Sequence, residues 1–331
     1  MKLINKIFCF LPFTADLFQI IVRQTWPLLV FIKNFFPNTN ENSPNIASFQ
    51  VANICNASCI FCAYPISKMK KGVMKYETFK KALAKVLWNC KDLKTIDLTP
   101  TVGDPLIDMN LFEKIGLSKD LNLNVVLTTN GILLYKYFQN IIDSKLDQIF
   151  ISLPSFDNED YKEVYGVDYC DLLKHGLAEL LNKKSNKLHV HLRFRNKISP
   201  SKIIKSKFFQ DFIKPNLNKN VSFNFTANFD NWGGTIKNLP KDMKMKPVLS
   251  SLKTPCLGLS SVAVLFDGKI RACGCRFIET DNDDLVIGSL SDEWKDIELN
   301  RRKLINDFKL GKRPKTCQNC SFYNPNSKIN I

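Results

Sequence analysis

The sequence predicts an α/β fold in which parallel strands form a partial (β/α)6 barrel. Short apolar runs alternate with amphipathic helical stretches, at a spacing typical of parallel sheets. The expected strands are residues 49–54, 95–99, 124–128, 148–153, 188–194 and 221–227. Helical periodicity lies between them, for example at residues 76–88, 133–144 and 171–183. Six strand–helix units are fewer than the eight of a complete barrel.

The fifth and sixth expected strands each have one polar face. The polar positions of LHVHLRFR and VSFNFTAN are His189, His191, Arg193 and Arg195, and Ser222, Asn224, Thr226 and Asn228. Parallel strands covered by helices on both faces are usually apolar on both sides. The alternation therefore predicts that these faces line a wet lumen, with a solvated edge strand as the alternative.

From about residue 255 the pattern changes to a hairpin followed by a helix. VAVLFDGKIRACGC places alternating apolar residues around an Asp267-Gly268 turn, a strong hairpin signal. A helical stretch at residues 292–309 and the segment KTCQNC follow. We expect residues 241–331 to form a second, small domain after a core at residues 46–240.

The N-terminal segment, residues 1–45, is apolar, yet it does not match a membrane span. Pro12 interrupts the first apolar run, which argues against a signal peptide. Arg23 and Lys33 would be costly inside a bilayer, and Pro27 would kink a helix there. We expect a helix pair packed on the core and a polar linker at residues 37–45. An interfacial helix that makes peripheral membrane contact through residues 1–36 is the alternative.

Composition is ordinary for a globular protein and does not indicate a nucleic-acid surface. The 331 residues are 45% hydrophobic and carry a formal net charge of +16, mostly from lysine. Lysines such as Lys68, Lys70, Lys71 and Lys75 are scattered without interleaved aromatic residues. We expect a cytoplasmic protein, with membrane association as the alternative.

Three cysteines, Cys55, Cys59 and Cys62, lie within eight residues. A structural zinc site normally has four ligands arranged as two pairs, and no fourth ligand is near. Three thiolates suit a 4Fe–4S cluster with one iron left open. The loop follows the first expected strand, at the end of the sheet where α/β barrels place their chemistry.

This Cys-x3-Cys-x2-Cys spacing resembles the signature of the radical S-adenosylmethionine (radical SAM) superfamily, and Phe61 before the last cysteine agrees with it. The resemblance implies that the open iron binds the amino and carboxylate groups of SAM. It also implies that one-electron reduction yields a 5′-deoxyadenosyl radical, which abstracts hydrogen from a substrate.

Further segments resemble the SAM-binding elements of this superfamily. In TVGDP, the expected contacts are Gly103, Asp104 and Pro105, although Val102 and Asp104 depart from the usual Gly-Gly-Glu-Pro pattern. The resemblance also implies Asn130 in LTTNG and Ser152 in ISL, where Ser152 approaches the ribose. Arg193 is the expected partner of the SAM carboxylate, because a guanidinium pairs bidentately with such groups.

A second set of cysteines, Cys256, Cys273, Cys317 and Cys320, combines a hairpin with a later Cys-x2-Cys. By spacing alone, zinc remains a serious alternative. The set resembles the SPASM or twitch extensions of radical SAM enzymes, and specifically the single-cluster twitch-like form. That resemblance implies a small hairpin-plus-helix iron–sulfur domain whose auxiliary 4Fe–4S cluster has four cysteine ligands. Cys275 is a spare neighbour, while Cys9, Cys90 and Cys170 are expected to be buried apolar residues.

The resemblance favours an oxidoreductase that acts on a small polar or sugar-like molecule, with the auxiliary cluster taking the second electron. An alternative is a maturase that modifies a peptide or protein, although residues 1–48 look too short and apolar for a leader-binding domain. A non-catalytic metal-binding or RNA-associated protein is a third class. Lumen candidates for a base are His191, Asp97 and Arg195. Expected partners are the substrate and an electron donor such as a flavodoxin or ferredoxin.

Overall fold

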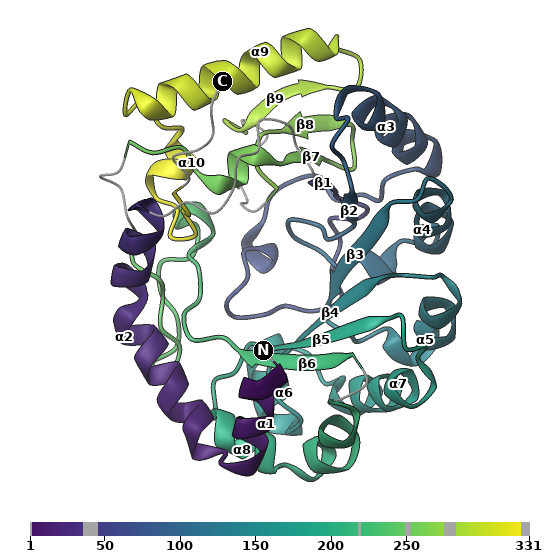
Figure 1. The fold of residues 1–331 in the computed structure, drawn as a ribbon, viewed down its shortest axis with the longest axis vertical. Coiled ribbons are helices and arrows are strands. Elements are labelled where there is room, and N and C mark those ends of the chain that lie inside the picture. The colour runs from purple at the N-terminus through teal and green to yellow at the C-terminus, as the bar shows by residue number, and fades with distance from the viewer. Residues whose placement is uncertain (1, 36–45, 218–219, 249–252, 275–282, 326–331) are drawn as a thin grey trace.

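The strands of the computed structural model form one curved sheet in the order β6-β5-β4-β3-β2-β1-β7-β8-β9 (Figure 1). The structure describes residues 2–35, 46–217, 220–248, 253–274 and 283–325. The first six strands are parallel, and their bounds are β1 Ile46–Phe49, β2 Thr95–Asp97, β3 Asn124–Thr129, β4 Gln148–Leu153, β5 His189–Phe194 and β6 Val221–Phe225. The sheet does not close, which confirms the predicted partial barrel.

Helices cover the convex face of the sheet, as Figure 1 shows for α3, α4, α5 and α7. The helices between the strands are α3 Tyr76–Asn89, α4 Leu111–Asp120, α5 Leu134–Asp143, α6 Asn158–Tyr165, α7 Cys170–Lys183 and α8 Pro200–Lys205. Along β3 and β4, buried residues alternate with partly exposed ones. The buried set includes Leu127 and Ile151, which pack in the same core as Leu173 and Leu177 of α7. The alternate positions face the interior of the barrel, where the polar side chains gather.

The first strand lies earlier than predicted. β1 is Ile46–Phe49, not residues 49–54, and it pairs in parallel with β2 on one side and β7 on the other. Val51 and Ala52 are fully buried, so they look like strand residues in the sequence. Their partners, however, come from the chain after the cysteine loop: the Met74 amide donates to the Val51 carbonyl, 2.8 Å away.

The C-terminal hairpin extends the main sheet. β7 Val262–Val264 pairs in parallel with β1 and antiparallel with β8 Lys269–Arg271, which pairs with β9 Val286–Ser289. The predicted turn is present, with Gly268 at φ 89°. Helices α9 Trp294–Lys309 and α10 Lys315–Gln318 follow. The proposed boundary near residue 240 falls in the irregular connection between β6 and β7.

The N-terminal helix pair is present as α1 Lys2–Phe10 and α2 Phe13–Phe35, and α2 continues through Pro27. Asn5 meets the outer edge of β6: its Nδ2 donates to the Phe223 carbonyl (2.8 Å), and its Oδ1 accepts from the Phe223 amide (3.2 Å). The side-chain amide thus makes the hydrogen bonds that the main chain of a further strand would make with that edge. The predicted linker, residues 37–45, lies outside the described residues. None of the helices in the described part of the chain has the length and apolar run needed to cross a bilayer.

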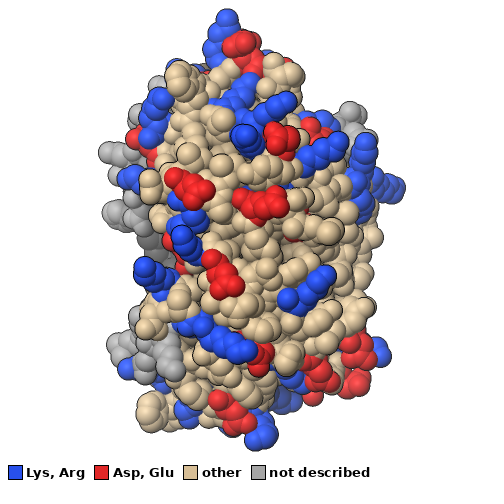
Figure 2. Space-filling model, turned by 90° about the vertical axis from the view of Figure 1, so that its right-hand side faces the viewer, with Lys and Arg blue, Asp and Glu red and all other residues tan. Residues whose placement is uncertain are grey.

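The outer face of the barrel helices carries charges of both signs. Figure 2 shows Lys and Arg interspersed with Asp and Glu on this side, separated by uncharged residues. A continuous basic stripe, which nucleic acid binding would favour, is not seen on the face that Figure 2 displays.

Candidate active site

The three-cysteine loop begins six residues after β1, and it holds its sulfurs partly buried. The Cys62 amide donates to the Cys59 carbonyl (3.1 Å), which folds the Cys-x2-Cys segment into a turn. N–H groups point at two sulfurs: Tyr64 donates its amide to Cys62 Sγ (3.4 Å), and Asn130 Nδ2 lies 3.6 Å from Cys55 Sγ. Hydrogen bonds to sulfur are one means by which proteins tune iron–sulfur clusters.

The electrostatics of this loop favour neutral thiols until a metal binds. Burial raises the pKa of Cys55 to about 12 and that of Cys62 to about 11, and it raises the pKa of Cys59 strongly. The neighbouring sulfurs add to the rise at Cys59 and Cys55, since each would repel a second negative charge. Metal binding displaces such protons. Three clustered sulfurs with N–H donors therefore fit a 4Fe–4S cluster with one iron open.

Gly103 of the TVGDP segment lies against the chain that enters the cysteine loop. A Cβ at this position would be 2.8 Å from the Ala52 carbonyl oxygen and 2.9 Å from the Ile54 carbonyl oxygen. Its φ of +115° is one that side chains rarely adopt. The next amide, from Asp104, donates to Ile54 (2.8 Å), and Pro105 begins a short 3₁₀ turn. Glycine is thus required for the two loops to meet.

The Asp104 carboxylate is buried and fully engaged by neighbouring donors. It accepts from the Leu106 amide (3.0 Å), from Thr129 Oγ1 (2.9 Å) and from the Asn130 amide (2.7 Å). Burial raises its pKa to about 6. Both carboxylate oxygens accept hydrogen bonds from protein groups, so this side chain organises the ends of β2 and β3. Asn130, held in this way, also donates to Asn56 Oδ1 (2.7 Å) beside Cys55.

Phe61 and Ser152 lie on two sides of a buried tyrosine. The Phe61 ring centroid is 6.1 Å from that of Tyr165, whose hydroxyl hydrogen-bonds to Ser152 Oγ (3.1 Å). Phe61 also packs on Phe229 at 5.2 Å. The structure therefore connects the cysteine loop to the fourth strand through Tyr165, a residue that the sequence did not single out. Its only sequence signal is its position in an amphipathic helix.

A polar cleft of about 570 Å³ follows the polar faces of β5 and β6. The lining residues are Gln148, Phe150, His189, Val190, His191, Arg193, Arg195, Ser222, Asn224 and Thr226. The Arg193 guanidinium lies 3.7 Å from the centre of the Phe150 ring, and Arg195 Nη1 donates to Thr226 Oγ1 (3.3 Å). Burial, together with Arg195, lowers the pKa of Arg193 to about 10. The expected wet interior face is therefore present.

His191 is held on both ring nitrogens. Nδ1 lies 2.7 Å from Ser222 Oγ and Nε2 lies 3.0 Å from Asn224 Oδ1. The amide oxygen can only accept, so Nε2 carries the proton and Nδ1 accepts from the serine. Burial, together with the charge of Arg193, lowers the pKa of His191 to about 4. A neutral ring with both nitrogens engaged is poorly placed to act as a free base.

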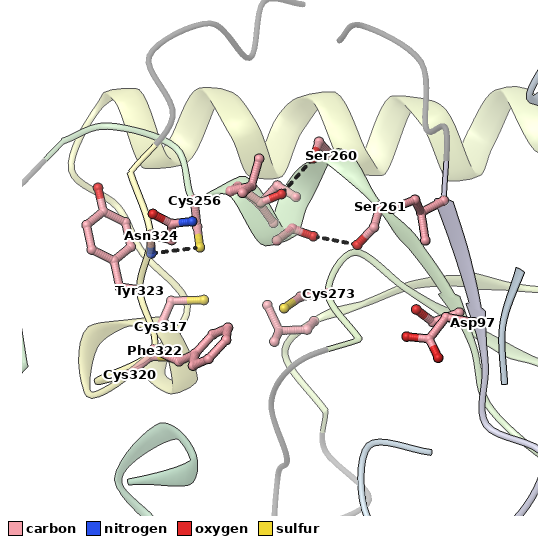
Figure 3. A pocket seen from close by; sticks show the side chains of 16 residues that line it. Asp97, Cys256, Ser260, Ser261, Cys273, Cys317, Cys320, Phe322, Tyr323 and Asn324 are labelled. Atoms are coloured by element: carbon pink, nitrogen blue, oxygen red, sulfur yellow. Dashed lines mark hydrogen bonds between the residues drawn. The ribbon is translucent and has the colours of Figure 1, made fainter. Parts of the chain in front are cut away.

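The four C-terminal cysteines line a second pocket of about 450 Å³. Figure 3 shows Cys256, Cys273 and Cys317 directed toward one another. The Asn324 amide donates to Cys256 Sγ (3.5 Å). Burial and Cys273 raise the pKa of Cys256 to about 12, and burial raises the pKa of Cys317 further, with contributions from the other three sulfurs. These four thiols, including Cys320, therefore form one electrostatically coupled group.

The four thiols surround one pocket. Across the described residues, no three His, Cys, Asp or Glu side chains converge closely enough to ligate a single ion, and this holds at both cysteine sites. A 4Fe–4S cube spreads its ligands over four irons, so four thiols around one pocket fit it. Zinc held by the same four thiolates is the alternative that metal analysis distinguishes. Cys275 lies outside the described residues, whereas Cys9, Cys90 and Cys170 are buried as expected.

Asp97 lines the cysteine pocket and does not line the polar cleft with His191 and Arg195. Figure 3 places it at the opposite end of the pocket from Cys256. Its carboxylate accepts from the Thr99 amide (2.9 Å), and burial raises its pKa. The three candidate bases are therefore divided between two cavities.

The loop after β6 connects the two cysteine sites. Trp232 Nε1 donates to the Phe61 carbonyl (2.8 Å), while Asn231 exchanges hydrogen bonds with Ser321, next to Cys320. Thr101 makes a further link through its hydroxyl to the Gly274 carbonyl (3.0 Å). This bridge depends on residues with no local signal in the sequence.

Sequence comparison identifies the domain that carries the first site. The profile of the Radical SAM superfamily matches residues 49–187, which span the three-cysteine loop through α7. Residues 49–187 therefore form a radical SAM domain. A domain of this family implies a SAM-binding 4Fe–4S cluster, and the three-cysteine loop fits that cluster.

Known proteins are similar to parts of this chain. An uncharacterized protein of Methanocaldococcus jannaschii is 34% identical over 131 residues, which is 39% of this chain and 41% of the relative. A "Probable GTP 3′,8-cyclase" of Methanococcus maripaludis is 28% identical over 128 residues, 38% of this chain and 42% of the relative. The chain therefore spans less than half the length of these curated relatives.

Among solved structures, BtrN in complex with AdoMet and 2-DOIA is similar in fold, with a TM-score of 0.56. The match covers 85% of this chain and 94% of that one at 17% identity. At this identity the likeness concerns the fold alone. It extends well beyond the radical SAM domain matched by sequence.

Proposed function

We propose that this radical SAM enzyme is an oxidoreductase that removes hydrogen from a small polar or sugar-like molecule. The observation that supports this most is the lining of the polar cleft, where guanidinium, imidazole, hydroxyl and amide groups from β5 and β6 face one cavity of about 570 Å³. This volume suits a small molecule. A substrate with several hydroxyl groups could exchange hydrogen bonds with such a lining.

Cys55, Cys59 and Cys62 are the proposed ligands of the SAM-binding cluster. The remaining proposed SAM contacts are Phe61, Gly103, Asp104, Pro105, Asn130, Ser152 and Arg193. Asp104 acts indirectly, because its carboxylate accepts a hydrogen bond from the Asn130 amide and so positions that residue. SAM bound there supplies a 5′-deoxyadenosyl radical on one-electron reduction, with a reduced flavodoxin or ferredoxin as the proposed donor.

Cys256, Cys273, Cys317 and Cys320 are the proposed ligands of an auxiliary 4Fe–4S cluster in a twitch-type unit at residues 241–331. If the substrate is an alcohol, its carbon gives a hydrogen atom to the radical and its hydroxyl gives a proton to a base. The remaining electron passes to the auxiliary cluster, and a carbonyl is left. Asp97 is the proposed base because it is a buried carboxylate that is close enough to Arg193 of the polar cleft for the two charges to interact.

The similar fold of BtrN, in its complex with AdoMet and 2-DOIA, supports a small-molecule substrate. The relative named as a GTP 3′,8-cyclase supports the shared superfamily and not the oxidation step. Modification of a peptide or protein side chain is the alternative outcome. Cytoplasmic location is part of the proposal, because iron–sulfur chemistry of this kind needs a reducing compartment.

The test is anaerobic reconstitution with iron and sulfide, followed by addition of SAM and a reductant. We expect about eight irons per chain for two clusters and formation of 5′-deoxyadenosine. Cys55→Ala should abolish SAM cleavage. Cys317→Ala should lose about four irons yet keep cleavage. Zinc at the second site, or loss of cleavage in Cys317→Ala while the first cluster stays loaded, would overturn the division of roles.

Substrate class is tested on the reconstituted protein with candidate polyhydroxylated molecules and with peptides. A deuterated small molecule that transfers deuterium to 5′-deoxyadenosine and yields a carbonyl product supports the proposal. If deuterium is transferred only from a peptide side chain, the protein is a maturase and the proposed oxidation of a small molecule is wrong.

A further inference from the structure

Helix α2 turns polar side chains toward the barrel and apolar side chains outward, while α1 buries Asn5, Phe8 and Cys9 and exposes Ile4, Ile7 and Phe10. Gln19 is buried and donates to the Thr226 carbonyl (2.7 Å), and Arg23 Nε donates to the Ala227 carbonyl (2.7 Å). Asp16 accepts from the Ser201 amide (3.2 Å). These side chains follow one face of α2, three to four residues apart. That face is fixed against the β6 end of the barrel, so the opposite face must point away from it.

The outward face is apolar over both helices. It consists of exposed residues that we call the N-terminal apolar face: Ile4, Ile7, Phe10, Leu11, Phe13, Leu17, Phe18, Ile20 and Ile21. Phe10 and Phe13, at the turn between the helices, are 84% and 62% exposed. Ordinary surface helices have the reverse pattern. Nine exposed apolar residues between Ile4 and Ile21 suggest an interaction site, whereas single exposed apolar residues are normal.

Rotation of α2 would not relieve this exposure. A half-turn would bury the leucines and isoleucines, but it would withdraw the donors from the Thr226 and Ala227 carbonyls at the end of β6. Unpaired backbone groups at a buried position are costly. The apolar face is therefore outward because the barrel uses the polar face.

Exposed lysines lie on α1 and on elements next to α1 and α2. Lys6 is exposed on α1, and Lys202 and Lys205 are exposed on α8, which packs against α2. Lys214 is exposed and close enough to Cys9 of α1 to influence its pKa. Apolar side chains bordered by lysines complement the surface of an anionic bilayer.

We propose that α1 and α2 bind the surface of a membrane that contains anionic phospholipids, with the N-terminal apolar face in the interface between headgroups and acyl chains. The positive charges near this face favour a membrane over a second copy of the chain as its binding partner. A two-fold dimer through this face would bring Lys6, Lys202 and Lys205 of one copy toward those of the other. Like charges brought together in that way oppose association.

The test is co-sedimentation of the full chain with vesicles, which requires no loaded cofactor. We expect binding to vesicles of phosphatidylcholine mixed with phosphatidylglycerol, weaker binding to phosphatidylcholine alone, and a decrease with salt. The double variant Phe10→Ser/Phe13→Ser should reduce partitioning roughly tenfold or more. Lys202→Glu/Lys205→Glu should reduce both the binding and its dependence on salt.

Matched controls distinguish binding through the N-terminal apolar face from nonspecific binding through exposed apolar residues elsewhere. Met109→Ser/Leu299→Ser changes two residues of similar exposure, 88% and 66%, outside α1 and α2, and it should bind as the unchanged protein does. Circular dichroism melting should be similar for all variants, because the changed side chains are exposed. Failure to bind either vesicle, or equal binding by the phenylalanine variant, would overturn the proposal. So would a dimer in light scattering that Phe10→Ser/Phe13→Ser dissociates, if vesicles are not bound.

Discussion

The indole Nε1 of Trp232 donates a hydrogen bond to the main-chain carbonyl of Phe61, 2.8 Å away, across 171 positions of sequence. Phe61 precedes Cys62, so the loop after β6 holds the cysteine loop directly. The same loop is bonded to the second cysteine site through Asn231 and Ser321. One short segment therefore fixes the positions of both.

Removal of the Trp232 donor should loosen the cysteine loop. Trp232→Phe keeps a ring but loses the hydrogen bond, which should lower the free energy of unfolding by about 1 kcal/mol. We also expect less iron at the first site after reconstitution, measured as iron per chain. Trp88→Phe is the control, since Trp88 is 77% exposed on α3. Wild-type stability and iron content in Trp232→Phe would mean that the bond does not position the loop.

Gly103→Ala should disable the first site selectively. The new Cβ would lie within 3 Å of the Ala52 and Ile54 carbonyl oxygens, at a φ that alanine rarely adopts. We expect iron to fall by about four per chain and 5′-deoxyadenosine formation to stop. Gly116→Ala is the matched control, because nothing lies within 4 Å of its Cβ position in α4. Normal SAM cleavage by Gly103→Ala would contradict the close approach of the two loops.

Gly258→Ala should have the complementary effect. Its Cβ would lie 2.9 Å from Cys273 Sγ, so that sulfur must shift, whereas the 3.8 Å contact to Cys256 Sγ is an ordinary one. We expect loss of about four irons with SAM cleavage retained, measured by iron analysis and by chromatography of 5′-deoxyadenosine. The same Gly116→Ala control applies. If the variant loses SAM cleavage as well as iron, the two sites do not act separately.

Acid should destabilise the protein through His191. Its pKa falls from an ordinary 6.5 to about 4 in the fold, mainly because of burial. Between those values the unfolded chain binds a proton that the folded chain does not, so stability falls as pH drops from about 6.5 to about 4. The full effect is on the order of 3 kcal/mol.

His191→Gln should remove that pH dependence, measured as denaturant unfolding at neutral pH and near pH 4.5. His175→Gln, on an exposed position of α7, serves as the control and should retain the dependence of the unchanged protein. Equal slopes for His191→Gln and the unchanged protein would show that His191 is not held neutral.

Asp104→Asn should destabilise the ends of β2 and β3. An amide in place of the carboxylate turns a donor toward the Asn130 amide or the Leu106 amide, which leaves a buried group unpaired. We expect a loss of roughly 2–3 kcal/mol in unfolding free energy. Asp92→Asn, an exposed change outside this network, is the control. An unchanged unfolding midpoint would rule out the organising role of Asp104.

Local patterns in the sequence were sufficient for much of the fold and for the first site. The predicted strand at residues 148–153 matches β4 Gln148–Leu153, and the polar positions of β5 and β6 do face one cavity. The Cys-x3-Cys-x2-Cys spacing predicted three sulfurs at the end of the sheet, where they are found. These features could be predicted because each depends on residues that are close in sequence, through strand alternation or a short loop.

Contacts between distant segments were decided only by the tertiary structure. Val51 and Ala52 have the burial of a strand, but Gly72 and Met74 are their neighbours, so β1 ends at Phe49. Asp97 faces the cysteine pocket because β2 lies beside β1, which in turn pairs with β7. Asn5 completes the edge of β6 from 218 positions away. Periodicity records which side of an element is buried, whereas the partner on that side depends on how the whole chain folds.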